Sequence, residues 1–219
     1  ARENRQRKGA ETEAAKARAG NAFLTAMFES IDPANSAGAE IRVRDVLDAA
    51  AAGLDAQGVA EPEVEASIRD VLGTAYHQLG LYPASTGQLE KALELREGAL
   101  GPDRAETLVS AAKLGQLMVA LRELDRAEAL TRRAYEGRSK VLGAMHSDTL
   151  VSQALLGFIQ QLRGDFDGAL ETTRRVLEAQ MRTVGAMDPT TLDTRASLAD
   201  ILEDMGRYDE ALEAARSLA

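Results

Sequence analysis

An internal repeat with a period of 42 residues constrains this 219-residue chain more than any other feature. A nine-residue stretch, Leu142 to Leu150, has one copy before it and one after it, and its threonine recurs at Thr107, Thr149 and Thr191. The two intervals are equal, so neither contains an insertion or a deletion. We therefore expect an array of similar units rather than a fold around one central core.

Other positions keep the same period. They are a small residue in the middle of each unit, an apolar residue near the start of its second half, and a small residue three positions later. These columns are Gly73, Gly115, Gly157 and Ala199; Tyr82, Leu124, Phe166 and Tyr208; and Ser85, Ala127, Ala169 and Ala211. Such columns indicate one supersecondary unit that is repeated and stacked.

The composition favours helices in these units. The chain is 45% hydrophobic but only 4% aromatic, with alanine and leucine supplying most of the apolar surface. Sheet proteins usually carry more β-branched and aromatic residues, so we expect an all-α fold with almost no strand. Four units are expected, at about residues 62–103, 104–145, 146–187 and 188–219, each a pair of helices.

Capping residues predict where the helices begin and end. First helices begin at signals such as Asp188 before Pro189, or Ser147 or Asp148 in the preceding unit. Second helices are expected to begin at an aspartate and to end at a glycine that supplies a left-handed turn. These aspartates and glycines are Asp125, Asp167 and Asp209, and Gly101, Gly143 and Gly185. Pro83, which replaces the aspartate in the first unit, is compatible with a first helical turn.

Two segments precede the repeats. Residues 1–34 are interpreted as a helical leader with a basic start, and residues 35–61 as a half-repeat whose helix, Ile41 to Ala56, caps the array. The first 20 residues carry six basic and three acidic side chains, whereas the whole chain has a net charge of −9.

We also expect Ala219 to mark a truncated array. Leu212, Ala215 and Leu218 would then lack a covering helix, and this C-terminal end would allow self-association.

The repeat columns carry a family resemblance. The patterns Leu72-Gly73, Tyr76, Gly80 and Tyr82, and Gly206 to Ala211, resemble tetratricopeptide repeats of the 42-residue, kinesin-light-chain-like type over about residues 62–219. The resemblance implies a right-handed superhelical solenoid of antiparallel helix pairs. It also implies a protein-interaction scaffold that binds a peptide or helix in a concave groove lined by the first helices.

A second resemblance covers Asn21 to Asp55, which looks like the leader before such arrays in bacterial serine/threonine protein kinases. The alternative function is therefore a regulatory or sensor region of such a kinase, whose catalytic domain would lie upstream because no kinase motif is present here. A membrane span upstream would give the basic start a juxtamembrane setting. The compartment stays open between the cytoplasm and the periplasmic side of a bacterial membrane.

The residues themselves give no support for an enzyme. The chain has no cysteine and only two histidines, His77 and His146, so neither a metal site nor a catalytic triad can be drawn, and no cofactor is expected. Glycines are not gathered into a phosphate-binding loop. The net charge of −9 and the few aromatic residues argue against nucleic acid as a partner, and no apolar run is long enough to span a membrane.

Helical spacing places the candidate groove on the first helices. The candidates are Val109, Lys113, Gln116, Val151, Leu155, Phe158, Leu162, Asp193, Asp200, Glu203 and Asp204. The apolar centre and acidic last unit would suit an apolar segment with a basic end. Alternatively, Leu155 and Phe158 only pack between helices. The asparagines that often hold a peptide backbone in such repeats are replaced by Val71, Lys113, Leu155 and Ser197, so backbone reading of an extended peptide is not expected.

Overall fold

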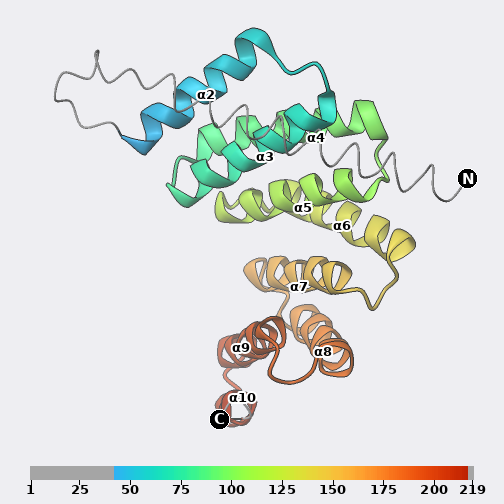
Figure 1. Ribbon diagram of the computed structural model, residues 1–219. Helices are drawn as coiled ribbons and strands as arrows, with labels where there is room; N and C mark the ends of the chain where they lie inside the picture. Colours follow the sequence, from blue (N-terminus) through green and yellow to red (C-terminus); the bar gives the residue numbers. More distant parts are fainter. Residues whose placement is uncertain (1–41, 217–219) are drawn as a thin grey trace, which may run out of the picture. The chain divides into compact units, whose positions relative to one another are not determined.

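The computed structural model describes residues 42–216, in which every regular element is an α-helix (Figure 1). These residues fall into two compact units that divide between Pro102 and Asp103. The helices are α2 (Val43–Gln57), α3 (Pro62–Gln78), α4 (Tyr82–Leu100), α5 (Ala105–Ala120), α6 (Leu124–Val141), α7 (Ser147–Leu162), α8 (Phe166–Thr183), α9 (Pro189–Asp204) and α10 (Tyr208–Arg216). The all-α fold class is confirmed. The leader at residues 1–34 and Leu218 lie outside the described residues.

The first unit is built around the pair α3 and α4, with α2 packed on α3. Apolar side chains of α2 meet those of α3 in one core. Its buried members are Leu47, Ala50, Ala51, Leu54, Val64, Ile68, Leu72 and Tyr76. The Tyr76 hydroxyl reaches across this core and donates to Asp48 Oδ1 at 2.9 Å. Helix α2 therefore covers one face of α3, and its role as a capping half-repeat stays a proposal.

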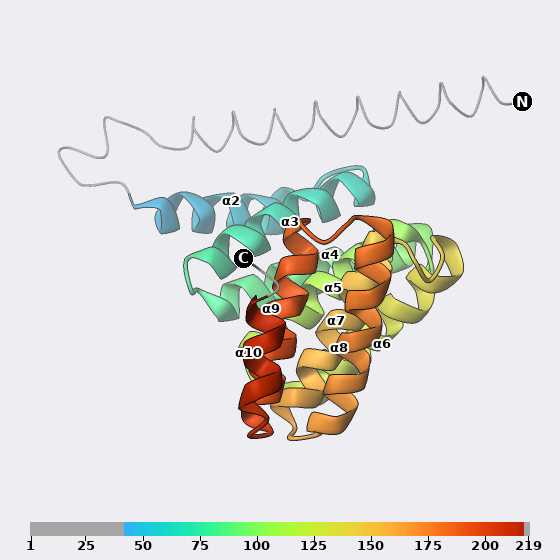
Figure 2. The same ribbon diagram turned by 90° about the horizontal axis from the view of Figure 1, so that it is seen from below.

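The second unit contains three consecutive pairs, α5 with α6, α7 with α8, and α9 with α10. Successive pairs are joined by packing of α6 on α7 and of α8 on α9. The first helices also contact one another, α5 with α7 and α7 with α9 (Figure 2). Residues at equivalent positions of these three helices are therefore brought close together.

The column of small residues marks where paired helices approach closely. A Cβ added to Gly73 would lie 2.6 Å from Leu89 Cγ, and one added to Gly115 would lie 2.7 Å from Thr131 Oγ1. Both distances are shorter than a real Cβ contact, so the side chain of Leu89 or Thr131 would have to shift to admit a methyl group, and glycine is favoured at these two positions. The second small column packs equally tightly, since Ser85, Ala127 and Ala169 are 0% exposed and Ala211 is 2% exposed.

The expected starts of several helices are corrected by the structure. The second helices begin one residue before the aspartates, at Leu124, Phe166 and Tyr208. In α8 the capping side chain is Asp165, not Asp167, because Asp165 precedes the helix and its Oδ1 accepts from the Gly168 amide at 3.0 Å.

Helix α7 is capped by His146 rather than by Ser147 or Asp148. The His146 backbone is extended, and its Nδ1 accepts from the Asp148 amide at 3.2 Å. Asp188 caps α9 as predicted, accepting from the Thr190 amide at 2.9 Å. The predicted glycine ends are confirmed: Gly101, Gly143 and Gly185 have φ angles of 92°, 98° and 98°.

Candidate functional site

A pocket of about 210 Å³ opens between the first helices α5 and α7 of the second unit. Five predicted groove residues line it, three from α5 and two from α7. These are Val109, Lys113 and Gln116, and Val151 and Leu155. They meet because they lie on one face of each helix, at i, i+4 and i+7 in α5, and because the repeat brings α5 beside α7.

Side chains of α6 complete the pocket, and the sequence argument missed them. Arg138 is only 7% exposed, and its Nη1 donates to Ser152 Oγ at 2.8 Å and to the Asp148 carbonyl at 3.0 Å. Burial lowers the pKa of Arg138, and the nearby Asp148 carboxylate partly offsets this. The sequence did contain a signal for Arg138, because another arginine, Arg96, stands at the equivalent position 42 residues earlier. In the structure Arg96 is buried as well.

The rest of the predicted apolar face continues along α7. Phe158 is 42% exposed, whereas its neighbour Ile159 is 1% exposed and belongs to the interior. Leu155 and Leu162 are half-buried, and Val151 is exposed. Phe158 and Leu162 do not line the pocket between α5 and α7. The outward face of α7 is therefore apolar for about three turns.

The four acidic candidates lie on α9, and three of them stand 42 residues after apolar residues of α7: Asp193 follows Val151, Asp200 follows Phe158, and Asp204 follows Leu162. All four are exposed. Gln161 Nε2 donates to Asp204 Oδ2 at 2.7 Å and links the two helices. The same face thus changes from apolar on α7 to acidic on α9.

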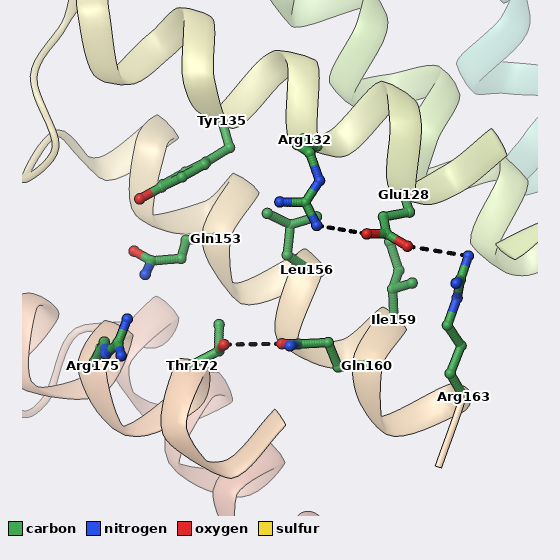
Figure 3. A pocket seen from close by; sticks show the side chains of 10 residues that line it. All are labelled: Glu128, Arg132, Tyr135, Gln153, Leu156, Ile159, Gln160, Arg163, Thr172 and Arg175. Carbon is green, nitrogen blue, oxygen red and sulfur yellow. Dashed lines mark hydrogen bonds and ion pairs between the residues drawn. The ribbon is translucent and has the colours of Figure 1, made fainter. Parts of the chain in front are cut away.

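A second pocket, of about 230 Å³, lies between α6, α7 and α8 (Figure 3), and sequence reasoning did not find it. Its lining contains three arginines and one glutamate. The lining residues are Glu128, Arg132, Tyr135, Gln153, Leu156, Ile159, Gln160, Arg163, Thr172 and Arg175. The two Glu128 carboxylate oxygens accept from Arg132 at 2.6 Å and bind Arg163 at 3.1 Å. Since the three arginines come from α6, the end of α7 and α8 at irregular spacing, no sequence period reveals them.

Both histidines contact neighbouring residues of the fold. His146 caps α7, and the His77 ring lies 5.8 Å from the Tyr82 ring. Within residues 42–216, no group of three or more His, Cys, Asp or Glu side chains is arranged to hold a metal ion. Over the same residues, no helix combines the length and the apolar character needed to cross a membrane.

Comparison with solved structures gives the same fold. A kinesin light chain-like protein of Podosopora anserina with nearly identical TPR-like repeats matches with a TM-score of 0.65 at 22% identity, covering 80% of this chain and 82% of that one. BtubC (BKLC) of P. vanneervenii matches with a TM-score of 0.66 at 17% identity, covering 93% and 87%. Aspartyl phosphate phosphatase F of Bacillus subtilis matches with a TM-score of 0.67 at 12% identity, covering 80% and 44%. At these identities the likeness shows the fold alone.

Sequence comparison identifies the family. No curated protein matches the chain significantly. The tetratricopeptide repeat family matches residues 64–140 and 148–218, which together exceed half of the chain. Proteins of this family are typically non-catalytic scaffolds that bind other proteins or peptides. With its 42-residue helix pairs, its glycine columns and this match, the chain belongs to the tetratricopeptide repeat family.

Proposed function

We propose that this protein is an interaction scaffold whose α5, α7 and α9 face binds a peptide or helix with an apolar segment and a basic end. The observation that carries the proposal is the change of character across this face. Val151 and Phe158 on α7 are exposed and apolar, while Asp193 and Asp200 at the equivalent positions of α9 are acidic. A ligand that crosses from α7 to α9 would therefore meet apolar surface first and negative charge next.

The apolar part would be bound by α7 and the pocket beside it. Phe158 is 42% exposed, so it is not a core residue, and Leu155 lines the pocket instead of closing the interior. Removing such surface from water contributes about 25 cal/mol per Å². The alternative, in which both side chains serve only packing between helices, does not account for the exposure of Phe158.

The basic end would be bound by the carboxylates of α9. Asp193, Asp200 and Glu203 are exposed and have no positively charged partner among the described ion pairs, whereas Asp204 is hydrogen-bonded by Gln161. Exposed charges attract a ligand mainly at low salt, since the screening length is about 8 Å at physiological ionic strength. We therefore expect affinity to fall as salt is raised. Because Lys113, Leu155 and Ser197 replace the asparagine ladder, recognition would rest on side-chain contacts.

The proposal can be tested by panning a random peptide display library on the protein. We expect enrichment of peptides in which two or three large apolar residues lie beside Lys or Arg. A synthetic peptide from the enriched set is then titrated against Phe158→Ala and Leu155→Ala. Each substitution should weaken binding by about 1–3 kcal/mol if these residues are anchors. Replacing Asp193, Asp200 and Glu203 by neutral amides should remove the salt dependence.

Thermal melting of the same variants separates binding from folding. Ile159→Ala serves as the core control, because that side chain is 1% exposed and its truncation should cost about 2–5 kcal/mol of stability. Phe158→Ala should melt close to the wild type. If Phe158→Ala and Leu155→Ala both lose stability and keep full affinity, the groove assignment is wrong.

Two further expectations stay predictions. The link to an upstream kinase rests on the resemblance of residues 21–55 alone. Self-association would involve α10, where Tyr208 is 70% exposed and Leu212 is 49% exposed. Sedimentation of wild type and Leu212→Ser at several concentrations tests the second expectation, since the variant should remain monomeric where the wild type associates.

A further inference from the structure

The pocket between α6, α7 and α8 contains polar groups that the interaction face does not use. Tyr135 of α6, Gln153 of α7 and Arg175 of α8 lie on one side of this pocket (Figure 3). Within residues 42–216, neither the Tyr135 hydroxyl nor the Gln153 amide forms a hydrogen bond with another residue, although both side chains are half-buried. Three helices thus bring together side chains whose N–H and O–H groups can still donate hydrogen bonds to a ligand.

Arg175 is available to such a ligand. Its ion-pair partner is Glu171, one turn earlier on α8, and both side chains are 65% exposed. Exposed pairs of this kind contribute little free energy, and a guanidinium has five N–H donors, so most of them remain for a ligand.

The carboxylate in the pocket does not oppose an anion. Glu128 is bound by both Arg132 and Arg163, and Arg163 also binds Asp125 Oδ1 at 2.6 Å. The lining itself contains three arginines and one glutamate, and the carboxylates that pair with Arg163 and Arg175, Asp125 and Glu171, do not line the pocket. Leu156 and Ile159 give it an apolar floor.

The size of the pocket limits what it holds. Its volume of about 230 Å³ lies below the roughly 300–1,000 Å³ of pockets that enclose drug-sized ligands. A single side chain fits this description better than a nucleotide or a cofactor. A carboxylate on a short aliphatic stem matches both the donors and the floor, because arginine binds carboxylates through paired N–H groups.

We propose that this pocket binds a Glu or Asp side chain of an acidic peptide, with Arg175, Tyr135 and Gln153 as the donors. The proposal goes beyond the function proposed above, since it concerns the α6, α7 and α8 surface and a ligand of opposite charge. The protein would then bind two unlike segments at once, one on each surface.

A fluorescein-labelled hexaglutamate peptide, with hexaglutamine as its uncharged control, tests the proposal by fluorescence anisotropy. We expect hexaglutamate to bind and hexaglutamine not to bind. Arg175→Gln should weaken binding roughly tenfold, as expected for loss of one charge-assisted contact, and Tyr135→Phe should weaken it less. In proton–nitrogen NMR spectra, the Gln153 side-chain amide should shift on addition of hexaglutamate.

Arg182→Gln is the matched control. Arg182 is on the same helix, pairs with Glu178 one turn earlier, and is similarly exposed, but it does not line the pocket. Its loss should leave affinity unchanged. If Arg175→Gln and Arg182→Gln weaken binding equally, the peptide responds only to net charge and the site is wrong. Absence of hexaglutamate binding by the folded wild type would also overturn the proposal. Neither result bears on the α5, α7 and α9 face.

Discussion

Thr149 Oγ1 donates a hydrogen bond of 2.9 Å to the carbonyl oxygen of Gly143. This contact links the first turn of α7 to Gly143, the glycine that follows the end of α6. Thr149 is 0% exposed, as are Thr107 and Thr191 at the equivalent positions. The threonine that defines the 42-residue period is therefore a buried residue of each repeat junction.

The two later threonines are expected to respond differently to valine. Thr149→Val leaves the Gly143 carbonyl without this donor and should lower the free energy of unfolding by about 1–2 kcal/mol. Thr191 Oγ1 is buried without a hydrogen-bond partner in the described part of the chain, so Thr191→Val should be neutral or stabilising. Urea denaturation of both variants measures the difference. Equal losses would show that shape, rather than hydrogen bonding, selects threonine here.

Two glycines of the first unit should respond to alanine in opposite directions. At Gly73 an added Cβ would lie 2.6 Å from Leu89 Cγ, so Gly73→Ala should destabilise by about 1–3 kcal/mol. Gly98, within α4, has no atom within 4 Å of an added Cβ, so Gly98→Ala should stabilise by about 0.5–1 kcal/mol. Thermal melting checks both signs, and a stable Gly73→Ala would contradict the close approach of α3 and α4.

The cap of α9 predicts a pH dependence. The side-chain hydroxyl and the amide of Thr190 donate to Asp188 and lower the pKa of its carboxyl. Because the folded pKa is depressed, this contribution to stability is full above the unfolded value of about 3.9 and is lost as pH falls through the folded pKa.

Asp188→Ala should therefore melt below the wild type at pH 7, and the difference should shrink as pH falls toward about 3. Asp188→Asn keeps a neutral acceptor at the cap, so its advantage over Asp188→Ala should persist at low pH. Melting temperatures of the three proteins across this range provide the measurement. A gap between wild type and Asp188→Ala that is constant with pH would count against the cap.

A buried ion pair in the first unit should be costly to break from one side. Arg96 of α4 bonds Asp70 of α3, and both are buried, at 7% and 4% exposure. Asp70→Ala leaves a buried guanidinium and should cost about 3–5 kcal/mol, whereas Asp70→Ala combined with Arg96→Met should recover most of that loss. Urea denaturation of the single and double variants tests this, and additive losses would contradict it.

The period predicted the helix pairs and their glycine ends because close packing and left-handed turns both require particular residues. The predicted starts at Asp125 and Asp167 are one residue late, and in α8 this is because Asp165 and Asp167 are both able to cap and only the backbone decides between them. Helical spacing placed Val109 and Leu155 each on one face of its helix, and the packing of α5 beside α7 brings the two residues into one pocket.

The burial of Arg138 and the pocket between α6, α7 and α8 could not be derived from the sequence. The column that Arg138 shares with Arg96 is visible in the sequence, but the burial of Arg138 is not, because this residue lies in a polar segment and only the packing of α6 on α7 buries it. The pocket of α6, α7 and α8 depends on Arg132, Arg163 and Arg175, which share no column of the repeat. This pocket exists only because three helices meet there, whereas a sequence repeat reveals only the residues that recur in each unit.

The hydrogen bonds that Arg138 donates to α7 should also decide which helix junction of the second unit opens first. Forty-two residues later the same place is held by Gln180, whose Oε1 is buried without a hydrogen-bond partner among the described residues. Among the described residues, Gln180 of α8 therefore forms no counterpart of the hydrogen bonds that Arg138 of α6 donates to α7. In a linear array the weaker junction opens first, so α9 and α10 should exchange their amide hydrogens faster than α7. A ligand that spans α7 and α9 would hold this junction shut, and its binding free energy would be linked to the local opening it prevents.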